Sequence, residues 1–184
     1  ASLLRADLAQ SGWGVESVEA LLGPVAAAAL QRELRAPALR VVRRALVAGA
    51  GATRASAAST SSDRPGPATG AASTSSATNA SQDGDVAGYK VAVLTALFML
   101  GEPVGAAALE TALPRTGVAG ALAIGLVVPT QSASGEQLYA PAVDLRPHEA
   151  VDDAGEVRWW VASDLGELVT GRALAPDHVL GVGG

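Results

Sequence analysis

The sequence predicts a mainly α-helical α+β fold, made of an N-terminal helical bundle, a winged-helix-like domain and a small β-ribbon. Three observations support this fold class. Apolar residues recur at helical spacing over residues 2–48 and again over 89–124. Between residues 126 and 162 they form short strand-like runs. Residues 49–85 separate the two helical regions. The chain is therefore expected to hold two helical regions, a spacer and a ribbon.

Residues 1–48 are expected to form a bundle of short helices. Ser2 suits the N-cap of a first helix that ends before Gly12. Gly23-Pro24 interrupts a second helical pattern, and Pro37 suits the first turn of a third helix. The later part of this region carries five arginines, at positions 32, 35, 40, 43 and 44. We interpret these arginines as a solvated helix face, with contact to nucleic acid as the alternative.

The segment 49–85 differs in composition from the rest of the chain. Serine, threonine, alanine, glycine and proline dominate it, and it holds no apolar side chain larger than alanine. Such a segment buries too little apolar surface to offset the conformational entropy that it would lose on ordering. We therefore predict a disordered insertion within a loop.

Residues 86–162 are predicted to form a winged-helix-like module. Apolar periodicity predicts three short helices, and runs of strand-forming residues predict three strands. The predicted helices are 89–100, 104–113 and 118–124, and the predicted strands are 126–128, 137–145 and 156–162. Three short helices followed by a two- or three-stranded β-ribbon is the element order of a winged helix.

The third helix of this module bears on whether the module reads DNA. A helix in the major groove needs Arg, Lys, Asn or Gln at its exposed positions. Residues 118–124 read Val-Ala-Gly-Ala-Leu-Ala-Ile and contain no long polar side chain. Residues 86–184 also carry eleven acidic against five basic residues. We therefore predict no sequence-specific DNA binding and interpret the module as a packing module.

Composition argues against several other classes of protein. The chain has 184 residues, no cysteine and a formal net charge of −5, which disfavours disulfides, thiol chemistry and general nucleic-acid binding. The longest apolar run, residues 25–30, is far shorter than the roughly 20 residues of a membrane span. We expect a cytoplasmic protein with no membrane contact.

The stretch 163–184 is predicted to form a capped helix and a glycine-rich connector. Ser163 suits the N-cap of a helix over Asp164–Thr170, and Gly171 suits its end. The last four residues, Gly181, Val182, Gly183 and Gly184, have the glycine density of a nucleotide-binding loop. They lack the strand-then-helix context that such a loop requires.

Two adjacent tryptophans precede this stretch. Strand alternation places Trp159 and Trp160 on opposite faces. We expect one indole to lie in the core and the other to cover an interface or contact a substrate. A stacking platform for a nucleic-acid base is the alternative.

No complete active site is visible in the sequence. Asp177 and His178 resemble an acid–base pair but lack an accompanying nucleophile, so a structural histidine in a loop fits better. The paired acids Asp152 and Asp153 are too few to hold a metal ion. We therefore predict no catalytic residue and no metal ligand in this chain.

Three segments carry a resemblance to a known family. They are LRADLAQSGWGVESVEALLGP at residues 4–24, LGEPVGAAALETALPRTGVAGALAIGLV at 100–127 and WWVASDLGELVTGRALAPDHVLGVGG at 159–184. Together they resemble the N-terminal region of actinobacterial class I S-adenosylmethionine-dependent methyltransferases of the small methyltransferase type. Release-factor glutamine methyltransferases and ribosomal-RNA guanine methyltransferases are enzymes of that type.

The resemblance implies a Rossmann-like catalytic domain after Gly184, with S-adenosylmethionine as the cofactor of the full-length enzyme. The cofactor loop and the catalytic motif of the family are absent here, so it implies no catalytic residue. It also places a connecting segment beside the cofactor cleft. This segment contains Asp177, His178, Gly181, Val182, Gly183 and Gly184. The implied partners are the protein's own C-terminal methyltransferase domain and a protein or RNA substrate.

The main functional hypothesis is therefore an N-terminal domain that orients substrate, or acts as a scaffold, for an appended N-methyltransferase. Its methyl acceptor would be a protein glutamine or a nucleic-acid base. The alternative is a stand-alone winged-helix module that binds nucleic acid or another protein.

Overall fold

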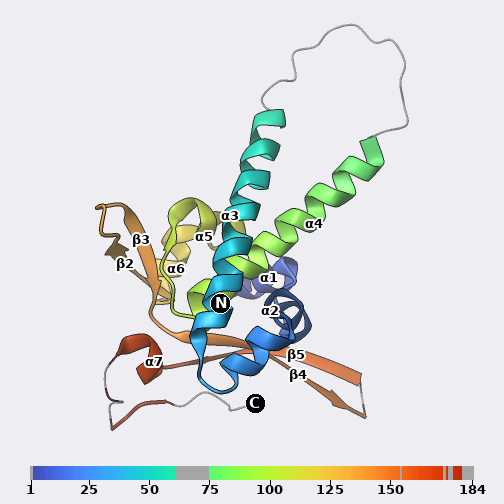
Figure 1. The fold of residues 1–184 in the computed structure, drawn as a ribbon. Coiled ribbons are helices and arrows are strands. Elements are labelled where there is room, and N and C mark those ends of the chain that lie inside the picture. Colours follow the sequence, from blue (N-terminus) through green and yellow to red (C-terminus); the bar gives the residue numbers. More distant parts are fainter. Residues whose placement is uncertain (1, 61–74, 154, 172, 174–175, 180–184) are drawn as a thin grey trace, which may run out of the picture.

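The computed structural model describes residues 2–60, 75–153, 155–171, 173 and 176–179 (Figure 1). Its fold is a mixed α+β fold, as predicted. The helices are α1 (Ser2–Ser11), α2 (Val15–Leu30), α3 (Arg35–Thr60), α4 (Ser75–Leu94), the π-helix η1 (Thr95–Met99), α5 (Ala106–Ala112), α6 (Gly117–Ala123) and α7 (Glu167–Thr170). The strands are β1 (Val104–Gly105), β2 (Val127–Gln131), β3 (Gln137–Pro141), β4 (Asp144–Asp152) and β5 (Gly155–Ser163).

The first two helices follow the sequence signals closely. The chain leaves α1 at Gly12, whose φ of 69° is a left-handed conformation that glycine adopts without a steric penalty. Within α2, Gly23 has φ 69° and ψ 167°, and Pro24 follows it, so the helix is kinked there. The predicted break at Gly23-Pro24 is therefore confirmed.

The middle of the chain contains three helical segments and a small antiparallel sheet. The sequence of elements is α4 with η1, β1, α5, α6, β2 and β3. The three strands form an antiparallel sheet in the order β1-β3-β2. Val104 lies opposite Tyr139, and Val128 lies opposite Ala140. The turn around Gly135 joins β2 to β3 and forms the wing (Figure 1).

The third predicted strand pairs with part of the second in a sheet of its own. The predicted strand 137–145 ends at Pro141, and a new strand, β4, begins at Asp144. The predicted strand 156–162 lies within β5, which pairs with β4 in a separate two-stranded sheet rather than with the wing. The apolar pattern marks strand residues but not their partners. Here Leu145 is buried in the core, which draws the chain away from the wing sheet.

The two long helices extend into the segment predicted to be disordered. Helix α3 continues to Thr60 and α4 begins at Ser75, so residues 49–60 and 75–85 are helical and the prediction is wrong for them. The frequent alanines of residues 50–58 have the highest helix propensity, which favours continuation of α3. Residues 61–74 lie outside the described part of the chain.

The last helix starts later than predicted. Its N-cap is Gly166 rather than Ser163, whose backbone belongs to the β4–β5 ladder opposite Asp144. The predicted end is confirmed, since Gly171 has φ 65° and closes the helix. Helix α7 lies against Gly101, where a Cβ atom would come within 2.5 Å of Val169.

A single hydrophobic cluster joins the N-terminal helices to the elements between α4 and β3. Trp13 lies at its centre, with its ring 6.1 Å from the ring of Phe98. The indole Nε1 of Trp13 donates a hydrogen bond of 3.1 Å to Oγ1 of buried Thr95, the first residue of η1. The predicted bundle and the predicted winged-helix module therefore share one core.

The close contact between α3 and α4 gives a test of this core. Replacing Gly49 by alanine is expected to lower the free energy of unfolding by about 1–3 kcal/mol, the usual range for overpacking. The reason is that a Cβ atom at Gly49 would lie 2.4 Å from Cδ2 of Tyr89. Urea denaturation followed by circular dichroism measures the change.

Gly51 is the matched control. It lies in the same helix, and a Cβ atom there would have no neighbour within 4 Å. Gly51→Ala is expected to raise stability by about 0.5–1 kcal/mol, because alanine is the better helix former. Equal shifts in the two variants would contradict the described contact between α3 and α4.

Membrane-spanning potential is limited in the described residues. No single helix among them is long and apolar enough to cross a membrane. Helices α1 and α2, which meet at 49°, reach the required length and composition only as a bent pair.

Candidate functional site

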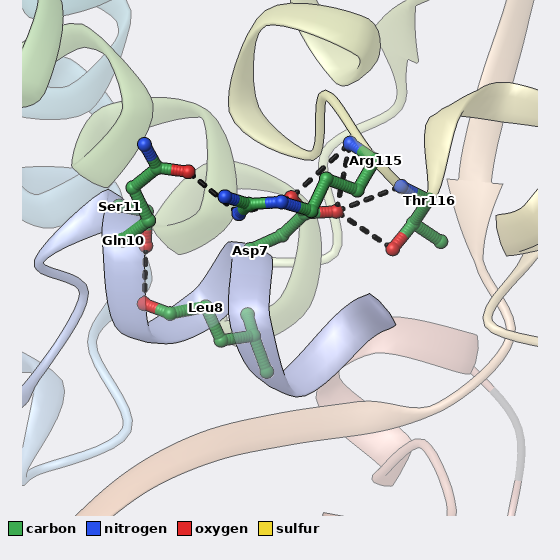
Figure 2. A network of polar contacts seen from close by, with 6 residues as sticks. All are labelled: Asp7, Leu8, Gln10, Ser11, Arg115 and Thr116. Carbon is green, nitrogen blue, oxygen red and sulfur yellow. Dashed lines mark hydrogen bonds and ion pairs between the residues drawn. The ribbon is translucent and has the colours of Figure 1, made fainter. Parts of the chain in front are cut away.

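The densest polar network lies between α1 and the turn that leads into α6 (Figure 2). The Asp7 side chain is fully buried. Its carboxylate accepts hydrogen bonds from the backbone N–H of Arg115 at 3.1 Å, and from the backbone N–H and the hydroxyl of Thr116 at 2.8 and 2.7 Å. The Arg115 guanidinium lies 3.5 Å from Asp7 Oδ1 and donates a hydrogen bond of 2.6 Å to Gln10 Oε1.

This network positions α6 rather than performing chemistry. Every contact of the Asp7 carboxylate is with a donor of the α5–α6 turn, and burial excludes a substrate from it. A buried carboxylate that satisfies two backbone N–H groups holds that turn in one conformation. The orientation of α6 is thus set by a residue in α1.

Three apolar residues in and after α6 are exposed. Leu122 and Ile124 keep 38% and 48% of their surface accessible, and Val128 at the start of β2 keeps 47%. We call these three residues the α6 face. Helix α6 contains no charged or amide side chain, and the neighbouring Arg115 is engaged by Asp7 and Gln10. The face can therefore take part in apolar contacts with a protein surface.

The two predicted tryptophans lie on opposite faces of β5, as expected. Trp160 packs against the core, and its Nε1 donates a hydrogen bond of 3.1 Å to the backbone oxygen of Trp13. Trp159 is 39% exposed and stacks on His148 of β4, with ring centroids 6.1 Å apart and planes inclined by 14°. The exposed indole is therefore available to a partner, and the other anchors the hairpin.

Both arginines of the hairpin are paired with carboxylates. Arg146 donates two hydrogen bonds, of 2.8 and 2.9 Å, to the Asp144 carboxylate. These bonds raise the pKa of the Arg146 guanidinium above its ordinary value against the opposing effect of burial, and the negative charge of Asp144 adds to the increase. Arg158 lies between two carboxylates, 2.5 Å from Glu156 and 3.6 Å from Glu149. Neither arginine is left free to bind a phosphate.

The structure does not combine Asp177 and His178 into a catalytic pair. Asp177 is exposed, whereas the His178 side chain is largely buried and its Nδ1 lies 4.0 Å from Oδ2 of Asp164. Asp164 in turn accepts a hydrogen bond of 2.8 Å from the backbone N–H of Val179. These contacts fasten the segment around His178 to the end of β5. The four other predicted site residues, at positions 181–184, lie outside the described residues.

Metal binding finds no support in the described ranges. Within them, no group of three or more His, Asp or Glu side chains is placed to hold a metal ion. The described strands form antiparallel ribbons and include no parallel strand followed by a helix.

Sequence reasoning missed two features of these surfaces. Leu122 and Ile124 were expected in a packing helix. Their exposure could have been predicted from one observation, since they are apolar residues at positions where a DNA-reading helix is polar and exposed. No local sequence pattern indicates that His148 stacks on Trp159, because this contact depends on the register of β4 against β5.

Comparison with known proteins identifies a family without an assigned activity. No curated protein and no solved structure matches the chain. Residues 10–137 match a family described as a domain of unknown function, DUF7059. This match spans more than half of the 184 residues and runs from the end of α1 through the α6 face to the start of β3. The chain therefore belongs to the DUF7059 family.

Proposed function

We propose that this chain is the substrate-orienting or scaffolding N-terminal part of a cytoplasmic class I S-adenosylmethionine-dependent N-methyltransferase. The observation that carries the proposal is the apolar, exposed α6 face on a winged-helix-like module. A helix at this position that reads DNA needs long polar side chains, whereas a helix that docks on protein needs apolar ones. The resemblance of residues 4–24, 100–127 and 159–184 supplies the enzyme class.

In this proposal the α6 face docks on the catalytic domain of the same protein. Burial of Leu122, Ile124 and Val128 stabilises the docked state at about 25 cal/mol per Å² of apolar surface. Asp7 contributes indirectly, because its hydrogen bonds to Arg115 and Thr116 fix the direction in which α6 points. The methyl acceptor is a protein glutamine or a nucleic-acid base, bound between the two domains.

The chemistry of methyl transfer is assigned to the catalytic domain. S-adenosylmethionine supplies the methyl group there, and this chain contributes position and exclusion of water. The segment that contains Asp177 and His178 is assigned a place at the edge of the cofactor cleft. Its attachment to Asp164 supports a defined direction for the chain as it leaves β5.

The first test is the reading frame. We expect codons beyond Gly184 to encode an Asp-x-Gly-x-Gly loop within about fifty residues, at the end of a strand that precedes a helix. Sequencing the gene and its transcript gives this result directly. A frame that ends without such a loop would refute the assignment to a methyltransferase.

The second test concerns the α6 face. In the full-length protein, the pair of substitutions Leu122→Ser and Ile124→Ser is expected to lower kcat/KM for methyl transfer at least tenfold. The reason is that a misdocked domain no longer aligns the acceptor. Transfer of a radiolabelled methyl group to separated protein and nucleic-acid fractions measures the rate and identifies the acceptor class.

Val25→Ser with Val47→Ser is the matched control. Both valines are more exposed than Leu122 and Ile124 and lie on α2 and α3, away from the α6 face. The control pair is expected to leave kcat/KM unchanged, and both pairs should leave thermal stability nearly unchanged because all four side chains are exposed. Equal activity of the two double variants would remove α6 from the proposal.

A stand-alone protein-interaction module is the second candidate, since the same exposed α6 face favours it. It predicts a binding partner sensitive to Leu122→Ser with Ile124→Ser and a reading frame without a catalytic domain. The two tests above therefore separate the candidates.

A further inference from the structure

The β4–β5 hairpin extends beyond the helices (Figure 1), and among the described residues its contacts with the core lie toward its base. At the base, Leu145 is buried and Trp160 is bonded to the backbone of Trp13. Toward the tip, residues 149–151 and 155–159 are all exposed, and Val151 keeps 82% of its surface accessible. A two-stranded hairpin of this kind is marginally stable in water without further contacts.

Among the described strands, β5 pairs only with β4, and an apolar stripe lies beside its outer edge. Among the described elements, α2 and η1 lie against β4, whereas β5 has β4 as its only extensive neighbour. Alternate backbone N–H and C=O groups of an edge strand point outward and can pair with another strand. Val157 and Trp159 lie on one face of β5, next to Ala150 and His148 of β4. This stripe is exposed along the free edge.

The other face of the same edge is acidic. Glu149 and Glu156 outnumber Arg158 there, and the Glu156 side chain remains 48% accessible. The hairpin as a whole has a net charge of −3, with arginines at 146 and 158 and carboxylates at 144, 149, 152, 153 and 156. Because both arginines are engaged by carboxylates, this charge distribution disfavours a nucleic-acid backbone and favours a cationic partner.

We propose that the outer edge of β5 takes up an extended polypeptide segment with alternating apolar and basic side chains, which joins the hairpin as a third strand. Backbone hydrogen bonds supply affinity in this mode of recognition, and alternate side chains supply specificity. The apolar side chains of the segment lie against Val157 and Trp159, and its basic side chains lie near Glu156. A third strand also pairs the outward backbone groups of β5 and gives a three-stranded sheet, which is more stable than a two-stranded hairpin. This inference does not depend on the methyltransferase assignment.

Calorimetric titration of the 184-residue chain with a twelve-residue peptide of alternating lysine and valine tests the inference. We expect binding that weakens as salt rises, because the charges are exposed to solvent. Trp159→Ala should weaken binding at least tenfold. The pair Glu149→Gln with Glu156→Gln should weaken it at least threefold and reduce its salt dependence. Val47→Ala, on the exposed surface of α3, should leave binding unchanged and is the control.

Two N-methylated peptides separate strand pairing from simple charge attraction. One carries N-methyl groups on every valine and the other on every lysine. In an added strand only one of these two sets of amides faces β5, so one peptide should bind and the other should not. This comparison uses the unaltered chain and remains decisive if Trp159→Ala fails to fold.

Three outcomes overturn the inference. They are no binding of the alternating peptide, equal binding of the two N-methylated peptides, and unchanged affinity in a folded Trp159→Ala variant. Preferential binding of an oligothymidine of matched length in a Trp159-dependent manner would assign the edge to nucleic acid and overturn it as well.

Discussion

Replacing Trp13 by alanine is expected to lower the free energy of unfolding by about 3–5 kcal/mol, as for other large-to-small changes at buried aromatic residues. Trp13 is 1% exposed and contacts Phe98 at the centre of the shared core. The substitution leaves a cavity between the N-terminal helices and η1, and it removes the donor that bonds to Thr95. Urea denaturation monitored by circular dichroism gives the change in free energy.

Trp159→Ala is the control for this prediction. Its indole is substantially exposed and lies on the hairpin, so the expected loss is well below that of Trp13→Ala. Trp13→Phe should fall between the two, because the phenyl ring refills part of the cavity but cannot donate to Thr95. Similar losses for Trp13→Ala and Trp159→Ala would contradict the position of Trp13 in the core.

Replacing Asp7 by alanine is expected to cost about 2–4 kcal/mol of stability, the range for leaving buried donors without an acceptor. Two backbone N–H groups and the Thr116 hydroxyl lose their acceptor, and the turn before α6 loses its link to α1. Thermal unfolding measures the loss. Hydrogen exchange of the Arg115 and Thr116 amides should also accelerate by a larger factor than exchange in α2.

Asp153→Ala is the corresponding control, since this carboxylate is exposed in the turn between β4 and β5. It should change stability by less than about 0.5 kcal/mol, as surface substitutions usually do. A double-mutant cycle between Asp7→Ala and Thr116→Ala should show coupling, because the two side chains share a hydrogen bond. Additive effects of the two substitutions would mean that this bond does not form.

Most helices of the fold could be predicted from local sequence. Apolar spacing located α1, α2, α5 and α6, and glycines marked the ends of α1 and α7, where a left-handed conformation closes the helix. The extensions of α3 and α4 could not be predicted in the same way. Their serine- and alanine-rich ends carry little apolar periodicity, and their packed parts meet through the close contact of Gly49 with Tyr89.

Strand identity was easier to predict than strand pairing. Residues 137–141 and 156–162 were recognised as strand, but β4 was not separated from β3, and the pairing of β5 with β4 was not predicted. A period of two residues reports only which face a side chain occupies. The partner is decided by long-range packing, here the burial of Leu145 and the anchoring of Trp160 on Trp13.

The features of the candidate surfaces also fall into two groups, those determined by local sequence and those decided by tertiary structure. Local sequence alone determined the order of the helices, the opposite faces of Trp159 and Trp160, and the absence of long polar side chains from α6. Tertiary structure alone decided that Leu122 and Ile124 are exposed, that His148 stacks on Trp159, and that Asp7 bonds to a turn 108 residues away. The physical reason is the sequence separation of the interacting residues. Helix periodicity and strand alternation arise from residues that are neighbours in the sequence. Exposure and a buried carboxylate's donors instead depend on which distant segments the common core brings together.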